Sequence, residues 1–68
     1  MIVKPFNLRL KDIRKSKRIT QEELGYRIGS HQSAIWSYES GRTTPQFDTL
    51  VRIIQALDCQ ANDLIPAK

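Results

Sequence analysis

The stretch TQEELGYRIGSHQSAIWSYESGR, residues 20–42, carries the strongest structural signal in this 68-residue chain. Thr20 is followed three residues later by Glu23, which is the pattern of a capping box at the start of a helix. Gly29 stands where such a helix would stop, because glycine readily takes the left-handed conformation that ends many helices. The stretch therefore predicts a short helix over residues 21–28.

A second short helix is predicted over residues 32–40. Ile35 and Tyr38 fall on one of its faces, and Gly41 provides its stop signal. Two short helices joined by a glycine turn form the kind of unit that places its second helix in the major groove of DNA. Residues on the outer side of this second helix are therefore the candidates for function.

Three further helices follow from the spacing of apolar residues on either side of this unit. Leu10 and Ile13 repeat at helical spacing and predict a first helix over residues 7–17. A fourth helix over residues 46–57 and a last helical turn over residues 61–65 complete the pattern. The apolar face of the fourth helix comprises Phe47, Leu50, Val51, Ile54 and Leu57, with Ile53 beside them. Five short helices without a strand predict an all-α fold, a compact five-helix bundle.

The length of the chain allows one domain, near the lower limit for folding on a single core. We expect an N-terminal arm over residues 1–6, the folded domain over residues 7–65 and a C-terminal tail over residues 66–68. Cys59 is the only cysteine, so no disulfide forms within the chain and no metal-ligand cluster is evident. We expect no cofactor. Cys59 is best interpreted as a small buried apolar side chain.

No signal peptide or membrane-spanning run is apparent, so the sequence predicts a cytoplasmic protein. The charge is unevenly distributed: residues 1–28 carry a net +5, and residues 29–68 a net −1. The densest basic segment is residues 14–18, RKSKR. Such a cluster can be a solvated face, but the sequence pI of about 9.6 favours a polyanionic partner.

The order of motifs along the chain adds to this interpretation. The motifs are Leu10-x-x-Ile13-Arg14, Ile19-Thr20-Gln21-Glu22-Glu23-Leu24, Ile28-Gly29, Ile35, Glu39-x-Gly41-Arg42, Pro45-x-Phe47-x-Thr49-Leu50 and Ala56-Leu57. Together they resemble the lambda-repressor/Cro-like (Xre-type) helix-turn-helix family, over about residues 7–65. The resemblance implies a five-helix DNA-binding domain whose third helix reads bases.

Helical geometry predicts which side chains of this third helix face DNA. At 100° per residue, Ser33 and Ser37 point directly outward, and Gln32 lies on a flank at the N-terminal end that enters the groove first. The Gln32 amide can bond adenine N6 and N7, which is worth roughly 1–3 kcal/mol of discrimination. Ser33 and Ser37 can bond almost any base edge, so they specify weakly. An ordinary exposed glutamine is the alternative for Gln32.

Trp36 departs from the family pattern, which more often has a small or polar residue at this position. Three interpretations are open. In the first, the indole contacts a thymine methyl or a sugar, which would make Trp36 a DNA base-contact residue. In the second, the indole covers a neighbouring side chain such as Arg42, and in the third it contacts another subunit.

Phosphate contacts are expected from helix ends and loops. The resemblance implies such a contact for Gln21, and Ser40, Arg42 and Thr43 follow the recognition helix. Arg27, Lys17 and Arg18 are further candidates, with a solvated face as an equally good account. His31 stands where the family usually has a capping Ser or Thr, and it is interpreted as a surface residue or a phosphate contact.

Arg14 and Glu39 are predicted to have a structural role. Glu39 lies on the inward side of the third helix, where an unpaired carboxylate would be costly. The family pattern pairs it with the arginine at the position of Arg14, so we expect a partly buried ion pair between the first and third helices. Gly25 stands where the family usually has alanine, and its missing Cβ would permit close helix approach.

The leading hypothesis is a sequence-specific transcriptional regulator, expected to be a repressor, that binds double-stranded DNA. One such domain contacts few bases, so a homodimer on a palindromic operator is expected. The C-terminal region with Leu64 and Ile65 is the predicted dimer surface, and the arm over residues 1–6 is the alternative. A second hypothesis is an antitoxin that binds a protein partner as well as its own operator. An enzyme is not indicated, because no nucleophile–base pair, phosphate loop or metal-ligand cluster is evident.

Overall fold

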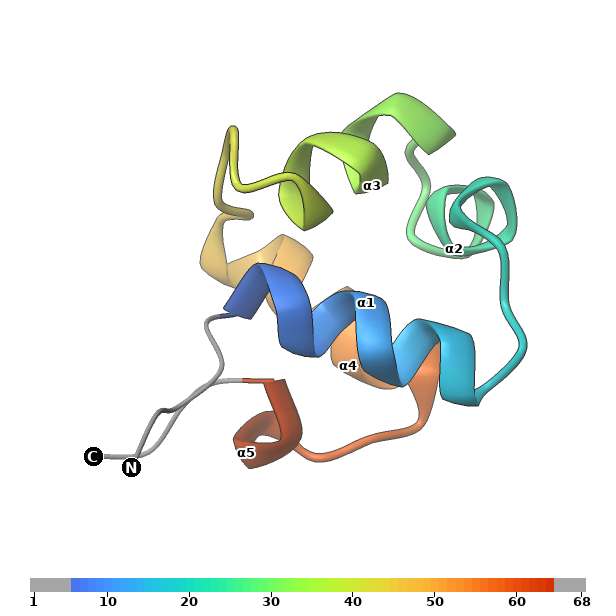
Figure 1. Cartoon of the computed structure of the whole chain (residues 1–68), viewed down its shortest axis with the longest axis vertical. Coiled ribbons are helices and arrows are strands. Elements are labelled where there is room, and N and C mark those ends of the chain that lie inside the picture. The colour runs from blue at the N-terminus through green and yellow to red at the C-terminus, as the bar shows by residue number, and fades with distance from the viewer. Residues whose placement is uncertain (1–5, 65–68) are drawn as a thin grey trace.

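The computed structural model describes residues 6–64, and every regular element in this part of the chain is a helix (Figure 1). In chain order the helices are α1 (Phe6–Ser16), α2 (Gln21–Arg27), α3 (Gln32–Glu39), α4 (Phe47–Leu57) and α5 (Ala61–Leu64). The predicted all-α fold of five helices is confirmed, and the helix bounds lie within one residue of those expected, the usual uncertainty of helix ends. Ile65, the rest of the expected arm and the expected tail lie outside the described residues.

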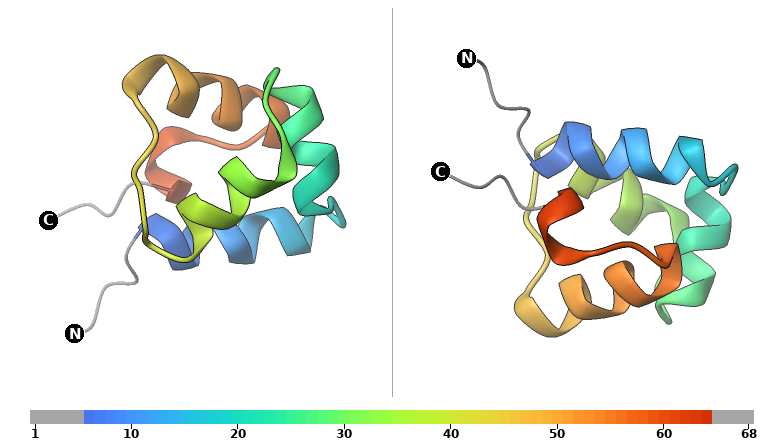
Figure 2. Two further views of the ribbon diagram at one scale, coloured as in Figure 1. Left: turned by 90° about the horizontal axis from the view of Figure 1, so that it is seen from above. Right: turned by 90° about the horizontal axis from the view of Figure 1, so that it is seen from below.

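The core is built from large apolar side chains that come from every helix. Figure 2 shows α1 and α4 on opposite sides of the molecule, with α2 closing one end. The α3 helix packs on α2 and α1, and α5 packs on α1. The buried apolar side chains are Leu10, Leu24, Ile28, Ile35, Ile53, Leu57 and Leu64. Burying one such side chain stabilises a fold by about 1.5–3 kcal/mol, so these contacts fix α3 against the rest of the domain.

Phe6 belongs to α1 and not to the expected N-terminal arm. Its ring is partly buried and packs against the core, which draws the first residue of the helix into the fold. Pro5 precedes it in the sequence, and proline is compatible with the beginning of a helix. The prediction of an arm over residues 1–6 is therefore wrong for Phe6.

Leu64 is a core residue and not part of an exposed dimer surface. Its side chain is 0% exposed and lies in the same cluster as Leu10 and Leu57. The short α5 helix packs on α1, and Leu64 is its buried residue. The prediction that Leu64 contributes to a dimer surface is therefore wrong, because the Leu64 side chain is buried in the core of its own domain.

The turn between α2 and α3 depends on two glycines. A Cβ on Gly25 would lie 2.5 Å from the carbonyl carbon of His31 and 2.7 Å from its oxygen, so the close approach expected at this position is present. Gly29 has a φ of 73°, a conformation that costs other residues about 1–2 kcal/mol. Together these glycines bring the beginning of α3 against α2.

One half of the predicted capping box is present at the beginning of α2, the bond from the Glu23 backbone to the Thr20 side chain, whereas the Glu23 carboxylate bonds Arg27 and not the Thr20 backbone. Thr20 has extended backbone angles, and its Oγ1 accepts a hydrogen bond of 3.0 Å from the Glu23 backbone N–H. The Glu23 carboxylate accepts 2.8 Å from Arg27 Nε, one turn further along. The Thr20 cap thus fixes the point at which Gln21 enters the helix.

Candidate nucleic-acid interface

The α3 helix lies at one edge of the molecule and exposes one face to solvent (Figure 1). Gln32, Ser33 and Trp36 are exposed, whereas Ile35 and Glu39 are buried. Ser37 is only partly exposed, although helical geometry predicts that it points directly outward. The chain turns back after α3, and the Ser37 carbonyl accepts 3.0 Å from the Arg42 backbone N–H. The exposed face of α3 is therefore concentrated at its first two turns.

The opposite side of α3 is held by a buried ion pair. Arg14 Nε lies 2.5 Å from Glu39 Oε2, and Arg14 Nη2 donates 3.1 Å to Glu39 Oε1. Both residues are 7% exposed. Arg14 Nη1 also donates 2.6 Å to the Ile19 carbonyl, so the guanidinium ties α1 to both α3 and the connection before α2. This two-bond geometry is the strong form of a carboxylate–arginine contact.

Gln21 connects this buried pair to the exposed face. Gln21 Nε2 donates 3.0 Å to Glu39 Oε1, and Gln21 Oε1 accepts 2.7 Å from Gln32 Nε2. Gln21, the expected phosphate-contact residue, is therefore a half-buried link between Glu39 and Gln32. A continuous hydrogen-bonded chain runs from Arg14 through Glu39 and Gln21 to Gln32. Sequence reasoning missed this link, because side-chain contacts between separate helices leave no periodic signal.

The beginning of α3 has a second fixed contact. His31 is the N-cap residue, yet its side chain makes no capping hydrogen bond. Instead, His31 Nδ1 lies 2.7 Å from Ser33 Oγ. Both side chains are exposed. The expected phosphate-contact residue His31 thus orients the hydroxyl of the expected base-contact residue Ser33.

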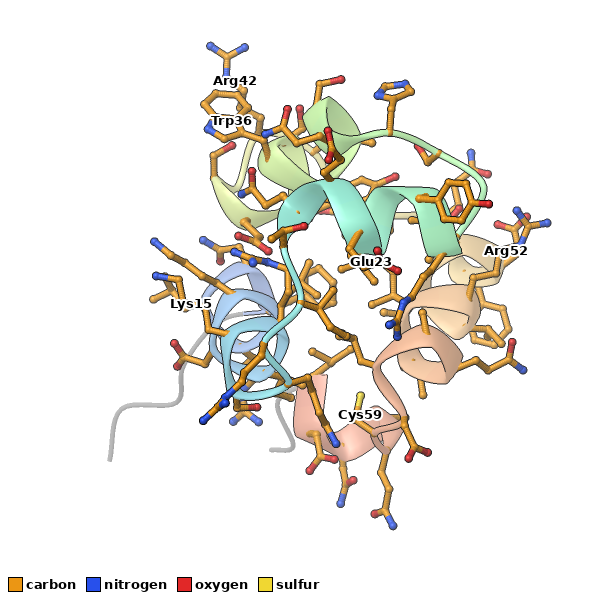
Figure 3. All side chains as sticks on the ribbon, turned by 90° about the vertical axis from the view of Figure 1, so that its right-hand side faces the viewer. Lys15, Glu23, Trp36, Arg42, Arg52 and Cys59 are labelled. Carbon is orange, nitrogen blue, oxygen red and sulfur yellow. The ribbon has the colours of Figure 1, made fainter. Side chains whose placement is uncertain are left out.

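The end of α3 places Arg42 over the indole ring of Trp36. The guanidinium carbon lies 5.4 Å from the ring centroid, and Figure 3 shows the two side chains together at the edge of the molecule. Of the three interpretations of Trp36, the structure shows the contact with Arg42. Ser40 and Thr43 are exposed in the same segment, and Ser40 Oγ donates 3.1 Å to the Ser37 carbonyl.

Arg27 lies in a different environment from the other phosphate-contact candidates. Its Nε donates to Glu23, and its Nη1 donates 3.2 Å to the carbonyl of Ala56 near the end of α4. The guanidinium thus links α2 to α4. A phosphate contact from Arg27 stays a prediction, and it would compete with both of these bonds.

Two hollows adjoin the exposed face of α3. The larger, of about 480 Å³, is open and is lined by Glu22, Tyr26, Ser30, His31, Gln32 and Ser33. The smaller, of about 170 Å³, is lined by Lys11, Gln21, Trp36, Glu39 and Ser40. Four lining residues are not among the sequence-predicted site residues: Lys11, Glu22, Ser30 and Tyr26, which is 81% exposed. Their signal was weak, because an exposed tyrosine and single polar or charged side chains are ordinary on any surface.

The described residues also show whether the chain has a metal site, a membrane-spanning helix or a reactive cysteine. Within residues 6–64, no group of three or more His, Cys, Asp or Glu side chains could hold a metal ion. None of the described helices is long and apolar enough to cross a membrane. Cys59 is partly buried against the core, and this burial, together with the Asp63 carboxylate, raises the pKa of its thiol. The exposed face of α3 is the best-defined candidate site in this part of the chain.

Comparison with protein families agrees with this geometry. Residues 10–64 match the helix-turn-helix family, and this range includes residues from all five helices. The chain belongs to the Cro/C1-type helix-turn-helix family. The family and its structural neighbours are DNA-binding transcription regulators and not enzymes.

One curated relative is also an HTH-type regulator. The chain is 33% identical over 60 residues to YqaE of Bacillus subtilis, an uncharacterized HTH-type transcriptional regulator. That match covers 88% of this chain and 52% of YqaE, so the chain spans about half the length of this curated relative.

Solved structures of this helix-turn-helix type superpose closely. The P22 c2 repressor in complex with a synthetic operator has a TM-score of 0.87 at 27% identity, covering 97% of this chain and 100% of that one. The restriction-modification controller protein C.AhdI from Aeromonas hydrophila has a TM-score of 0.83 at 27% identity, covering 88% of this chain and 91% of that one. SinR, a master regulator for biofilm formation solved in complex with DNA, has a TM-score of 0.79 at 28% identity, covering 87% and 95%.

Proposed function

We propose that this chain is a sequence-specific DNA-binding transcriptional regulator, a repressor, that binds a palindromic operator as a homodimer with α3 in the major groove. The observation that carries the proposal is the hydrogen-bonded chain from the Arg14–Glu39 pair through Gln21 to Gln32. It holds an amide at the beginning of an exposed helix, where base edges are read. The similarity to the P22 c2 repressor and SinR, both solved with DNA, supports the same function.

Base reading is assigned mainly to Gln32. Its Nε2 donates one hydrogen bond to Gln21, which leaves the Oε1 and the second N–H for a base. That donor and acceptor pair matches N6 and N7 of adenine. Ser33 and Ser37 are weaker readers, since a hydroxyl bonds many base edges and Ser37 is only partly exposed.

Phosphate contacts are assigned to the residues that surround α3. Ser40, Arg42 and Thr43 follow the helix and are exposed, and His31 precedes it. One amide N–H of Gln21 bonds Glu39. The second N–H can donate a hydrogen bond to a phosphate oxygen. Arg27 is the weakest of these candidates, because its guanidinium already bonds Glu23 and Ala56.

Dimerisation is inferred from the small number of base contacts that one recognition helix can make. Two copies with recognition helices about 34 Å apart would read two half-sites one helical turn apart. The proposed surface is the C-terminal region around α5, without Leu64. The antitoxin hypothesis also stays a prediction, and co-purification with a neighbouring gene product would support it.

The proposed function is tested by selecting bound sequences from a random DNA pool. We expect a palindromic consensus, with an affinity that falls steeply as salt concentration rises, because bound cations release counterions from DNA. Sedimentation with the selected operator should show two chains per duplex. A pool without any enriched sequence, or an affinity independent of salt, would contradict the proposal.

A further inference from the structure

Trp36, the only tryptophan of the chain, has its ring covered on one face. Its side chain is 46% exposed, and the Arg42 guanidinium lies 5.4 Å above the ring centroid (Figure 3). This distance is within the range of a cation–π interaction, in which the electron-rich ring face attracts the cation. The same face of the indole is therefore not available to a thymine methyl unless Arg42 moves.

The backbone fixes Arg42 close to Trp36. Gly41 has a φ of 82°, which turns the chain back toward α3, and the Arg42 backbone N–H donates 3.0 Å to the Ser37 carbonyl. Within residues 6–64, no hydrogen bond or ion pair to an acidic side chain engages the Arg42 guanidinium. The ring of Trp36 is thus the contact that orients this cation.

The surroundings of Trp36 favour an anion. The indole also lines the hollow of about 170 Å³, to which Lys11 contributes a second cation from α1. Glu39 lines the same hollow, but its carboxylate is neutralised by Arg14. The local charge next to Trp36 is therefore positive, as a DNA phosphate requires.

We propose that Trp36 is a positioning residue that holds the Arg42 guanidinium ready for a phosphate of the DNA backbone, and that it does not read a base. The proposal rests on the proposed function above. A guanidinium over a ring face keeps the N–H donors at its edge, where they can bond a phosphate in a bidentate manner. Because Arg42 is oriented before binding, less side-chain freedom is lost when DNA arrives. Trp36 then contributes to affinity on every sequence alike.

The test compares Trp36→Phe, Trp36→Leu, Arg42→Ala and the double variant Trp36→Leu/Arg42→Ala. Each is titrated against the operator selected by the wild-type chain and against its single-base substitutions, at two or more salt concentrations. We expect Trp36→Leu to weaken binding about two- to fivefold on all sequences, and Trp36→Phe to weaken it less because it keeps an aromatic face. Arg42→Ala should reduce the slope of log affinity against log salt concentration by about one. The loss of affinity caused by Arg42→Ala should be smaller in the Trp36→Leu background than in the wild-type chain.

Two results would overturn the proposal. The first is a loss for Trp36→Leu that is confined to one base pair, which would identify a thymine contact. The second is an additive double variant, which would show that the two side chains act independently.

A DNA-free measurement separates this inference from the proposed function. Because Trp36 is the only tryptophan, its fluorescence reports the Arg42 contact directly. We expect Arg42→Ala to shift the emission to longer wavelength as water replaces the guanidinium, and an unchanged spectrum would overturn the proposal. If the wild-type chain enriches no DNA sequence while the emission shift is present, the proposed function fails and the Trp36–Arg42 contact stands. Unchanged melting temperatures of the variants verify folding.

Discussion

Gln32 Nε2 donates a 2.7 Å hydrogen bond to Gln21 Oε1, and Gln21 in turn bonds the buried carboxylate of Glu39. The side chain at the beginning of α3 is therefore oriented by a contact that reaches into the interior. A carboxylate that pairs with Arg14 can hold a second donor at little extra cost, because its remaining lone pairs must be satisfied in any case. In this way a structural ion pair determines how an exposed amide is presented.

Glu39→Ala should destabilise the fold by about 3–5 kcal/mol, because it leaves the Arg14 guanidinium buried without its partner. Urea unfolding measures the change. Glu23→Ala is the matched control, since the Glu23–Arg27 pair is nearly half exposed and should contribute less than about 1 kcal/mol. Equal effects of the two substitutions would show that the buried pair has no special structural role.

Gly25→Ala should destabilise the fold although alanine is the better helix former by about 1 kcal/mol. The added Cβ would lie 2.5 Å from a backbone atom of His31, and overpacking of this kind costs about 1–3 kcal/mol. Thermal unfolding measures the change, and Glu22→Ala on the exposed side of α2 is the control. A higher melting temperature for Gly25→Ala would show that the α2–α3 turn relaxes freely.

Cys59 should react slowly with alkylating reagents in the folded chain. Burial raises the pKa of its thiol, so less thiolate is present than in the unfolded chain at the same pH. The proton is thus bound more tightly in the folded state, and the stability this provides is lost as pH rises through the folded pKa. Alkylation rates in buffer and in urea test this prediction, and equal rates would refute it.

Gln21→Ala should have two effects on DNA binding. It should weaken binding to all sequences, because the proposed phosphate contact of Gln21 is lost. It should also reduce the base preference that we propose for Gln32, because Gln21 no longer orients the Gln32 amide. Arg42→Ala is the comparison, since it should weaken binding uniformly and leave base preference intact. Titration against the operator and its single-base substitutions distinguishes the two. A purely uniform loss for Gln21→Ala would show that Gln32 needs no support.

Much of the fold follows from local sequence signals, whereas the burial of individual side chains does not. Apolar spacing, the Thr20 cap and the glycines at 29 and 41 predict all five helices, because these signals act within one turn of the chain. Spacing alone does not show which apolar residues face the core: Leu64 is buried, and Phe47 is 80% exposed although the spacing places it on the apolar face of the fourth helix.

The side-chain contacts of the site were harder to predict. The family resemblance implies the Arg14–Glu39 pair, whereas no sequence signal predicts the Gln21 link. The Trp36 contact with Arg42 was one of three open interpretations. Each of these contacts joins residues from different elements, so it depends on the packed structure and not on periodicity.

The most direct test of the central claim is the affinity of the wild-type chain and Gln32→Ala for the selected operator and each of its single-base substitutions. We expect Gln32→Ala to lose the preference at one symmetric adenine position, worth about 1–3 kcal/mol, and to keep its affinity for nonspecific DNA. Uniform weakening across all sequences, with the preference at every position unchanged, would contradict this claim.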